Sequence, residues 1–193
     1  MALRHIKLVV GNKQVGIAHL WSYDKDDGNI YVLPTYHITV SGTDDHNKPA
    51  SKNFECIRFG VLRKSERAKA RVAGWTHTKY WNTIKMWEPG YRVQSAGSPE
   101  NGAWNITGNF LIHDGPDDPT DRSDPFGAIG CVEICGPQGF IKFNDYIISL
   151  SGSKATSRNA KLKQIADRKR MKVFFEHAPF PPLKISPDPP KKP

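Results

Sequence analysis

A histidine and a cysteine stand beside two short apolar runs in the middle of the chain, and together they could form a nucleophilic site. His113 follows the apolar residues 110–112, whereas Cys131 follows Gly130 and precedes Val132. Only a few per cent of a free thiol is ionised at neutral pH, so a catalytic cysteine needs a nearby imidazole or backbone dipoles. Because Gly130 lacks a Cβ, the backbone before Cys131 can turn sharply and direct N–H groups at the oxygen that becomes negative in acyl transfer. These residue types therefore predict acyl transfer through a cysteine.

Two strands and a loop are predicted to position this pair. Residues 105–112 and 132–134 are apolar or β-branched runs, so His113 ends one strand and the cysteine precedes the next. Between them, residues 116–125 carry three prolines and four aspartates, which is typical of a turn-rich loop. Functional residues concentrate where strands hold such loops. We expect the loop to cover a cleft in which Trp104 or Phe126 forms an apolar wall.

The spacing resembles the signature of the YkuD-type L,D-transpeptidases. In that family a His is followed, after 14 to 17 residues, by Ser or Thr, a variable position, Gly, Cys and an apolar residue. Here residues 114–127 separate His113 from the run Ala128, Ile129, Gly130, Cys131 and Val132. The resemblance covers residues 104–146, about a third of the chain.

The resemblance implies a mainly β catalytic domain without a cofactor or a metal, and it implies residue roles. Cys131 would be the acylated nucleophile and His113 its base, and the carbonyl of Asp114 would orient the other ring nitrogen. The N–H groups of Gly130 and Cys131 would form the oxyanion hole. The family's thiolate attacks the bond between diaminopimelate and the fourth residue, D-alanine, of a peptidoglycan stem. An amine, a free D-amino acid or water then gives cross-linking, exchange or L,D-carboxypeptidase activity.

The chain departs from the family pattern at three positions. Ala128 replaces the usual Ser or Thr, Ile129 replaces a residue that is often polar, and Glu133 stands where many members carry Arg. A carboxylate at position 133 could meet the side-chain amine of diaminopimelate, or it could be an ordinary solvated strand residue. The predicted substrate contacts are Ile129, Glu133, Trp104 and Phe126.

The three cysteines cannot all pair with one another. If Cys56 and Cys135 are linked or buried, Cys131 is left as the reactive thiol. Cys131 could instead form a redox couple with Cys135 or join His113 on a metal, but the spacing fits no compact zinc signature. We therefore predict no metal site.

Composition indicates one domain with a basic surface. The 193 residues suit a single domain, residues 1–178, followed by a Pro- and Lys-rich tail, residues 179–193. Twenty-eight Lys and Arg against 19 Asp and Glu give a formal charge of +9, which favours an anionic partner such as a cell envelope or a nucleic acid. No segment approaches the roughly 18 apolar residues of a membrane span.

The start of the chain lacks the pattern of an export signal. We therefore expect synthesis in the cytoplasm, although the family's substrate lies outside it. This combination is similar to small L,D-transpeptidase-like antibacterial effectors of the type VI secretion system, which act in the periplasm of a target bacterium. The resemblance then implies peptidoglycan stem peptides as substrate, contact with a secretion apparatus, and an immunity protein in the producing cell.

Short strand signals dominate the first two thirds of the chain and predict an antiparallel sandwich or a barrel-like core. Two segments are predicted to be helical, residues 65–71, ending near Gly74, and residues 159–172. The expected strands are residues 6–10, 15–21, 30–33, 37–40, 54–62, 91–93, 105–112, 132–134 and 140–143.

Two alternative functions come from other classes. A papain-like peptidoglycan amidase would pair Cys131 with His177, but that histidine stands beside the proline-rich tail, a poor place for a rigid base. A nucleic-acid or partner-binding module would use the basic residues 161–172, with exposed aromatics for stacking. A basic run is more often a solvated helix face, so we expect no nucleic-acid binding. The aromatic candidates are Trp75, Tyr80, Trp81 and Trp87.

Overall fold

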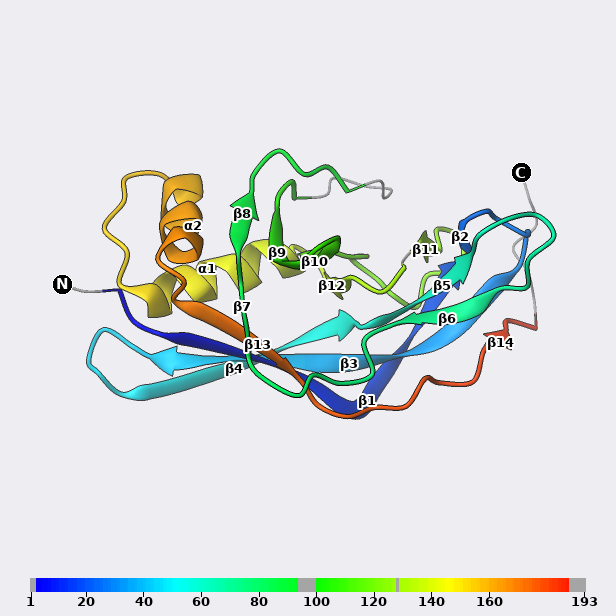
Figure 1. The fold of residues 1–193 in the computed structure, drawn as a ribbon, viewed down its shortest axis with the longest axis horizontal. Coiled ribbons are helices and arrows are strands. Elements are labelled where there is room, and N and C mark those ends of the chain that lie inside the picture. The colour runs from blue at the N-terminus through cyan, green and yellow to red at the C-terminus, as the bar shows by residue number, and fades with distance from the viewer. Residues whose placement is uncertain (1–2, 94–99, 128, 188–193) are drawn as a thin grey trace.

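Strands are the predominant regular elements of the molecule, as Figure 1 shows. The computed structural model describes residues 3–93, 100–127 and 129–187. Of these residues, 43% are in strands and 13% in two helices, which confirms the predicted mainly β class.

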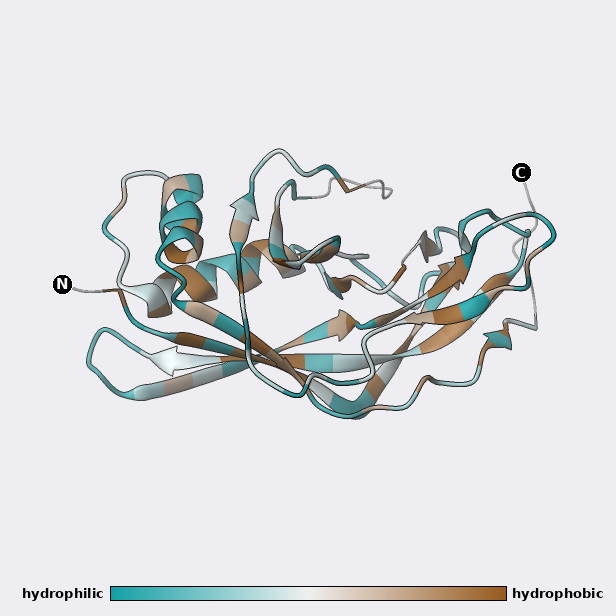
Figure 2. Cartoon of the chain, viewed as in Figure 1, coloured by the Kyte–Doolittle hydropathy of each residue, from teal (hydrophilic) through white to brown (hydrophobic). Residues whose placement is uncertain are grey.

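Three long strands make the centre of the larger sheet: β1 (Ile6–Trp21), β3 (Ile30–Thr43) and β4 (Pro49–Ile57). Hydrophobic and hydrophilic residues both occur along these strands, as the colours of Figure 2 show, and buried residues alternate with more exposed ones over parts of β1 and β3. The sheet order is β7-β13-β1-β3-β4-β12-β10-β9-β8. The remaining strands of this path are β7 (Asn82–Thr83), β8 (Met86–Glu88), β9 (Ala103–Thr107), β10 (Phe110–Asp114), β12 (Val132–Ile134) and β13 (Met171–Phe175).

Short strands extend this framework. The strand β11 (Phe126–Gly127) pairs with the end of β1, and β14 (Lys184–Ile185) pairs with β3. A second sheet contains β2 (Tyr23–Asp24), β5 (Phe59–Arg63) and β6 (Arg71–Gly74).

Strand pairing is mixed. The pairs β10–β12, β1–β13, β1–β11 and β2–β5 are parallel, and the other pairs are antiparallel. Within β1 the register against β3 shifts between Val10 and Gly16, so the long strand is irregular near its middle. The buried Arg58 donates hydrogen bonds to four backbone carbonyls beside this irregularity, those of Gly11, Trp75, Thr76 and Glu176.

Two helices cover one end of the sheet, as Figure 1 shows. The helix α1 (Gly139–Ser151) buries an apolar face that includes Phe143 and Ile147. The helix α2 (Arg158–Asp167) has Ser157 as its N-cap residue, and the Ser157 hydroxyl oxygen accepts a hydrogen bond from the backbone N–H of Ala160. Neither helix, in the part of the chain that the structure describes, is long and apolar enough to cross a membrane.

Several predicted elements differ from the observed ones. Residues 140–143 belong to α1, because the aromatic and β-branched run continues with apolar residues at helical spacing that pack on the sheet. Residues 91–93 form no strand. The predicted strand 105–112 is a hairpin of β9 and β10, with Gly108 at a positive φ of 55° in its turn.

Both helix predictions need correction as well. Residues 65–70 belong to the turn between β5 and β6, in which the Arg63 guanidinium donates hydrogen bonds to the carbonyls of Glu66 and Ala68, and residue 71 begins β6. The predicted helix 159–172 ends at Asp167, and the chain then enters β13. Within the tail, β14 pairs with β3, and the backbone N–H of the buried Ser186 donates a hydrogen bond to the carbonyl of Ile30.

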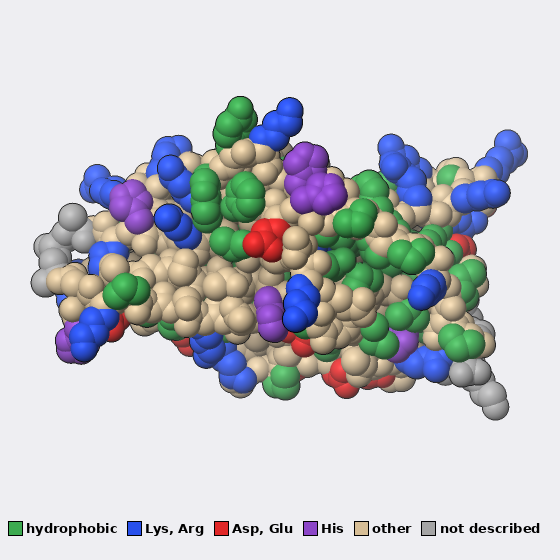
Figure 3. Space-filling view, turned by 90° about the horizontal axis from the view of Figure 1, so that it is seen from below, with side chains coloured by type: hydrophobic (Ala, Val, Ile, Leu, Met, Phe, Trp, Pro, Cys, Tyr) green, Lys and Arg blue, Asp and Glu red, His purple; other side chains and the backbone are tan. Residues whose placement is uncertain are grey.

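The surface is basic along its length. Figure 3 shows a face on which Lys and Arg side chains occur from one end to the other, with few acidic side chains between them. This distribution agrees with the formal charge of +9.

Candidate functional site

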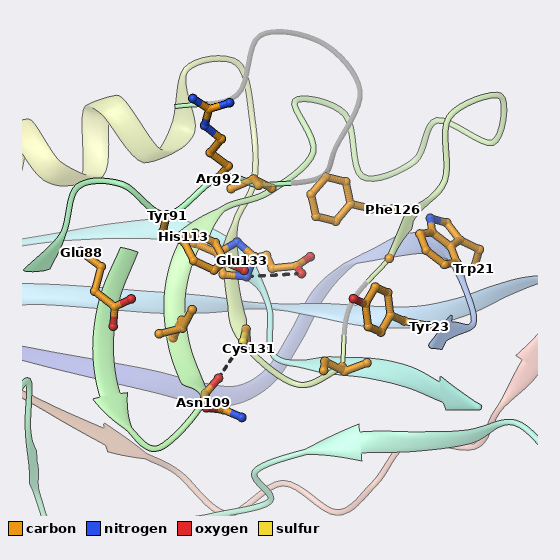
Figure 4. Close-up of a pocket in the computed structure, with 14 residues that line it drawn as sticks. Trp21, Tyr23, Glu88, Tyr91, Arg92, Asn109, His113, Phe126, Cys131 and Glu133 are labelled. Carbon is orange, nitrogen blue, oxygen red and sulfur yellow. Dashed lines mark hydrogen bonds and ion pairs between the residues drawn. The ribbon is translucent and has the colours of Figure 1, made fainter. Parts of the chain in front are cut away.

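A cavity of about 440 Å³ opens between the strands that carry the predicted pair and the end of β1. Figure 4 shows His113, Glu133 and Cys131 on one side and the rings of Trp21, Tyr23 and Phe126 on the other. The lining residues are Trp21, Tyr23, Glu88, Tyr91, Arg92, Val93, Asn109, Leu111, His113, Phe126, Gly127, Ile129, Cys131 and Glu133.

Strand register brings the polar groups together. The strands β10 and β12 are parallel neighbours, and His113 lies directly opposite Glu133. Side chains alternate along a strand, so Leu111 and Cys131, two residues before these, face the same side. The pairing of β10 with β12 therefore brings the His113 imidazole, the Glu133 carboxyl and the Cys131 thiol into one cavity.

His113 is held by its neighbour's backbone. Its Nδ1 lies 2.7 Å from the carbonyl oxygen of Asp114, which is the contact expected from the resemblance. The imidazole is only 5% exposed, and burial lowers the pKa of His113 to about 4. At neutral pH the ring is therefore neutral. Since a neutral ring carries one N–H and that proton is donated to Asp114, Nε2 is left as a proton acceptor.

Glu133 is buried beside this acceptor. Its Oε1 lies 3.8 Å from His113 Nε2, and its Oε2 has no hydrogen-bond partner among the described residues. Burial, and secondarily the charge of Asp114, raises the pKa of Glu133 well above its usual range. The side chain is 1% exposed, so the alternative of a solvated strand residue is wrong.

Cys131 is partly exposed and protonated at neutral pH. Burial raises the pKa of the Cys131 thiol to about 11, and the Glu133 carboxylate acts in the same direction. Its Sγ lies 3.6 Å from the carbonyl oxygen of Asn109. No hydrogen bond joins this thiol to His113, although both residues belong to the described ranges and line the same cavity.

Gly130 is required by a close backbone approach. Its φ is 107°, and a Cβ at this position would lie 2.6 Å from the Cα of Gly74. A larger residue would therefore push the cysteine loop away from β6. The oxyanion hole assigned to the N–H groups of Gly130 and Cys131 stays a prediction, and Ala128 lies outside the described residues.

The four predicted substrate contacts have different outcomes. Phe126, Ile129 and Glu133 line the cavity. Trp104 does not line it, so its predicted role as a wall is wrong. It is fully buried and donates from Nε1 to Asn144 of α1 at 2.8 Å, because its position on β9 faces the helix instead of the cleft.

Cys56 and Cys135 are buried and unlinked, which leaves Cys131 as the most accessible thiol. His177 is exposed, and its ring lies 5.7 Å from that of His77. It does not line the cavity, so the structure does not bring this alternative base to Cys131.

The basic residues 161–172 are divided between α2, a turn and β13. Of the aromatics considered for stacking, Trp87 is buried and Trp75 packs against Phe110 and Phe175. Tyr80 and Trp81 remain accessible, at 80% and 40% exposure. The Trp81 ring lies 5.5 Å from that of Phe174 in β13.

Sequence reasoning missed part of the cavity wall. Trp21 and Tyr23 come from the end of β1 and from β2, far from the signature in sequence. Tyr91 packs its ring 5.3 Å from that of His113. Because residues 91–93 were predicted to form a strand, the contact of Tyr91 with His113 was not anticipated. No local sequence pattern places Trp21, Tyr23 or Tyr91 at the site.

No protein family model, curated protein or solved structure matches this chain. The resemblance to the L,D-transpeptidases therefore rests on the residue pattern of its signature.

Proposed function

We propose that the cavity is the acyl-transfer site of a cysteine-dependent enzyme that acts on the L,D bond of peptidoglycan stem tetrapeptides. The observation that carries the proposal is the shared cavity of Cys131 and His113, with His113 Nδ1 held 2.7 Å from the Asp114 carbonyl. This contact leaves Nε2 free to accept a proton, which is the state that a general base needs.

The proposed reaction has two steps. Cys131 Sγ leaves the Asn109 carbonyl and passes its proton to His113 Nε2. The thiolate then attacks the carbonyl carbon of the third stem residue. The departing amine of D-alanine takes the proton from His113 as the thioester forms. Water or a second amine later attacks the thioester and returns a proton to Sγ.

The cavity suits a peptide end in size and in character. Its volume of about 440 Å³ lies within the range of small-molecule sites. The apolar rings of Trp21 and Phe126 face the polar trio across the opening, as Figure 4 shows. Such a wall excludes water from a thioester at Cys131, and this slows hydrolysis of the thioester before an acceptor binds.

A muropeptide assay tests this proposal. The full chain is incubated with tetrapeptide muropeptides, with and without a free D-amino acid, and products are followed by mass spectrometry. We expect loss of tetrapeptide and a gain of tripeptide or of exchanged peptide. We also expect a thioester adduct on the peptide that contains Cys131.

Matched variants separate the mechanism from its alternatives. Cys131→Ala should abolish turnover, and His113→Ala should reduce it about a hundredfold or more, because the base is lost. His177→Ala should retain turnover. Unchanged muropeptides with the wild-type chain would reject the proposal, and a requirement for His177 but not His113 would favour the amidase alternative.

The proposed substrate sets the biological part of the proposal. A wall-modifying enzyme must reach the periplasm, and we propose delivery into a target bacterium by a secretion apparatus. A producer would then need an immunity protein against the same enzyme. The formal charge of +9 favours an acidic inhibitor, because complementary charge speeds encounter.

A further inference from the structure

The cavity contains two polar atoms that face each other without a direct bond. Glu133 Oε1 and His113 Nε2 lie 3.8 Å apart, which is beyond hydrogen-bond length. The second oxygen of Glu133, also buried, has no partner among the described residues. A buried carboxyl group without partners is costly, so these atoms require a hydrogen-bond donor that the described residues do not supply.

The geometry suits a donor placed between the two atoms. A nitrogen at about 2.9 Å from each would complete a triangle whose third side is the observed separation of 3.8 Å. An ammonium group has several N–H donors and no acceptor, so it can satisfy both oxygens of Glu133 and the imidazole nitrogen. A hydroxyl group has only one proton and cannot do so.

The surroundings also favour an organic cation. The cavity walls contain the rings of Trp21, Tyr23 and Tyr91, and aromatic faces attract cations. The other carboxylate of the lining, Glu88, already accepts a hydrogen bond from Asn105. The guanidinium of Arg92 is exposed at the rim, so Glu133 is the buried carboxyl group that an ammonium would meet, and the positive charge of the ammonium would favour the ionised form of Glu133.

We propose that the cavity binds a primary ammonium group beside Cys131, with Glu133 as its counter-ion. Within the proposed function, on which this role rests, the group is the amine that accepts the acyl chain. The ammonium nitrogen gives one proton to the Glu133 carboxylate and a second to His113 Nε2 as it attacks the thioester carbonyl carbon. The carbon–sulfur bond breaks, and the proton passes from Nε2 to Cys131 Sγ. Glu133 thereby favours transfer to amines over hydrolysis.

Direct binding tests the site without requiring turnover. The full chain is titrated with n-butylammonium chloride and, separately, with 1-butanol, and binding is followed by calorimetry and by the NMR signals of the His113 ring. We expect the wild-type chain to bind the ammonium at least about tenfold more tightly than the alcohol, since one charge-assisted hydrogen bond is worth that much.

Two isosteric variants complete the binding test. Glu133→Gln should lose the preference for the ammonium, whereas Glu66→Gln, which removes a carboxylate from an exposed turn, should keep it. Thermal melting of each variant checks that it folds. Equal binding of ammonium and alcohol by the wild-type chain, or an unchanged preference in Glu133→Gln, would overturn the proposal and leave water as the bridging group.

Product partition tests the acceptor role. With tetrapeptide as acyl donor and an amine as acceptor, Glu133→Gln should shift the ratio of transfer to hydrolysis toward hydrolysis by about tenfold. An unchanged ratio would remove Glu133 from acceptor binding. If no thioester forms on Cys131, the proposed function fails, while the ammonium titration still decides whether the binding site exists.

Discussion

Burial shifts the pKa values of three groups in the cavity, those of His113, Cys131 and Glu133, toward their uncharged forms. At neutral pH His113, with a pKa of about 4, is deprotonated and Cys131, with a pKa of about 11, is a thiol, while burial raises the pKa of Glu133 well above its usual range. A single buried charge would be poorly solvated, so the reactive state arises by moving one proton between groups. Transfer from Cys131 to His113 creates two opposite charges side by side, and each stabilises the other.

The pH dependence of Cys131 alkylation follows from this arrangement. The pKa of Cys131 is raised to about 11, and the Glu133 carboxylate contributes to the increase. The thiolate therefore forms only as pH rises toward 11, and removing the neighbouring charge lowers that pH. We predict that Glu133→Gln alkylates about three- to tenfold faster than wild type at pH 9, with iodoacetamide labelling followed by mass spectrometry.

The control is Glu66→Gln, which changes net charge by the same amount on an exposed turn. Its alkylation profile should coincide with that of wild type. A slower reaction in Glu133→Gln would mean that the glutamate assists the thiolate, contrary to its position beside Sγ on the same strand face.

At the scale of elements, the loop between β11 and β12 depends on contact with β6. Gly130 and Gly136 both have positive φ values, 107° and 97°, but only Gly130 meets another backbone, that of Gly74. We predict that Gly136→Ala costs about 1 kcal/mol of unfolding free energy and that Gly130→Ala costs about 3 kcal/mol or more. Chemical denaturation measures both.

The difference between the two losses of unfolding free energy measures the steric contact with β6 separately from backbone strain, because both variants place alanine at a positive φ. Equal losses in the two variants would show that the loop can move away from β6 without cost. A larger loss in Gly130→Ala should be accompanied by altered alkylation of Cys131, since the displaced loop carries the thiol.

The pairing of β10 with β12 could be predicted from the sequence, because the apolar runs of these two strands are short and separate. The runs ending at His113 and beginning at Val132 predict neighbouring strands, and these are paired in the structure. The same reasoning fails at residues 140–143, where aromatic residues suit both a strand and an amphipathic helix. Contacts with the sheet, which a local pattern does not contain, decide between them.

The polar side of the cavity was predictable and the aromatic side was not. His113, Cys131 and Glu133 stand within one signature, and alternation along two strands brings them to one face. Trp21 and Tyr91 arrive from distant segments, so their placement depends on the whole sheet. Trp104 was misplaced because it lies opposite Ile112 in the β9–β10 hairpin and so shares the face of Ile112, which is opposite to that of His113.

At the scale of the whole molecule, the proposed biological role predicts where the protein is toxic. Expression in the bacterial cytosol should be tolerated, and expression with a fused periplasmic signal should slow growth and lyse cells. Cys131→Ala and His113→Ala should remove the effect, and immunoblots check that each form accumulates. Equal growth with the cytosolic and periplasmic forms would argue against an antibacterial toxin.

The register shift in the middle of β1 should divide the local unfolding of the molecule into two parts. On one side of it, residues 6–10 pair with β13 and residues 7–10 also with β3; on the other side, residues 16–21 pair with β3, and Leu20 and Trp21 also pair with β11 at the cavity. Ladder hydrogen bonds are interrupted between the two parts, so amide protons should exchange with solvent in two separate cooperative units. A ligand in the cavity would slow exchange in the second unit alone, and the half that carries the helices would keep its own opening free energy.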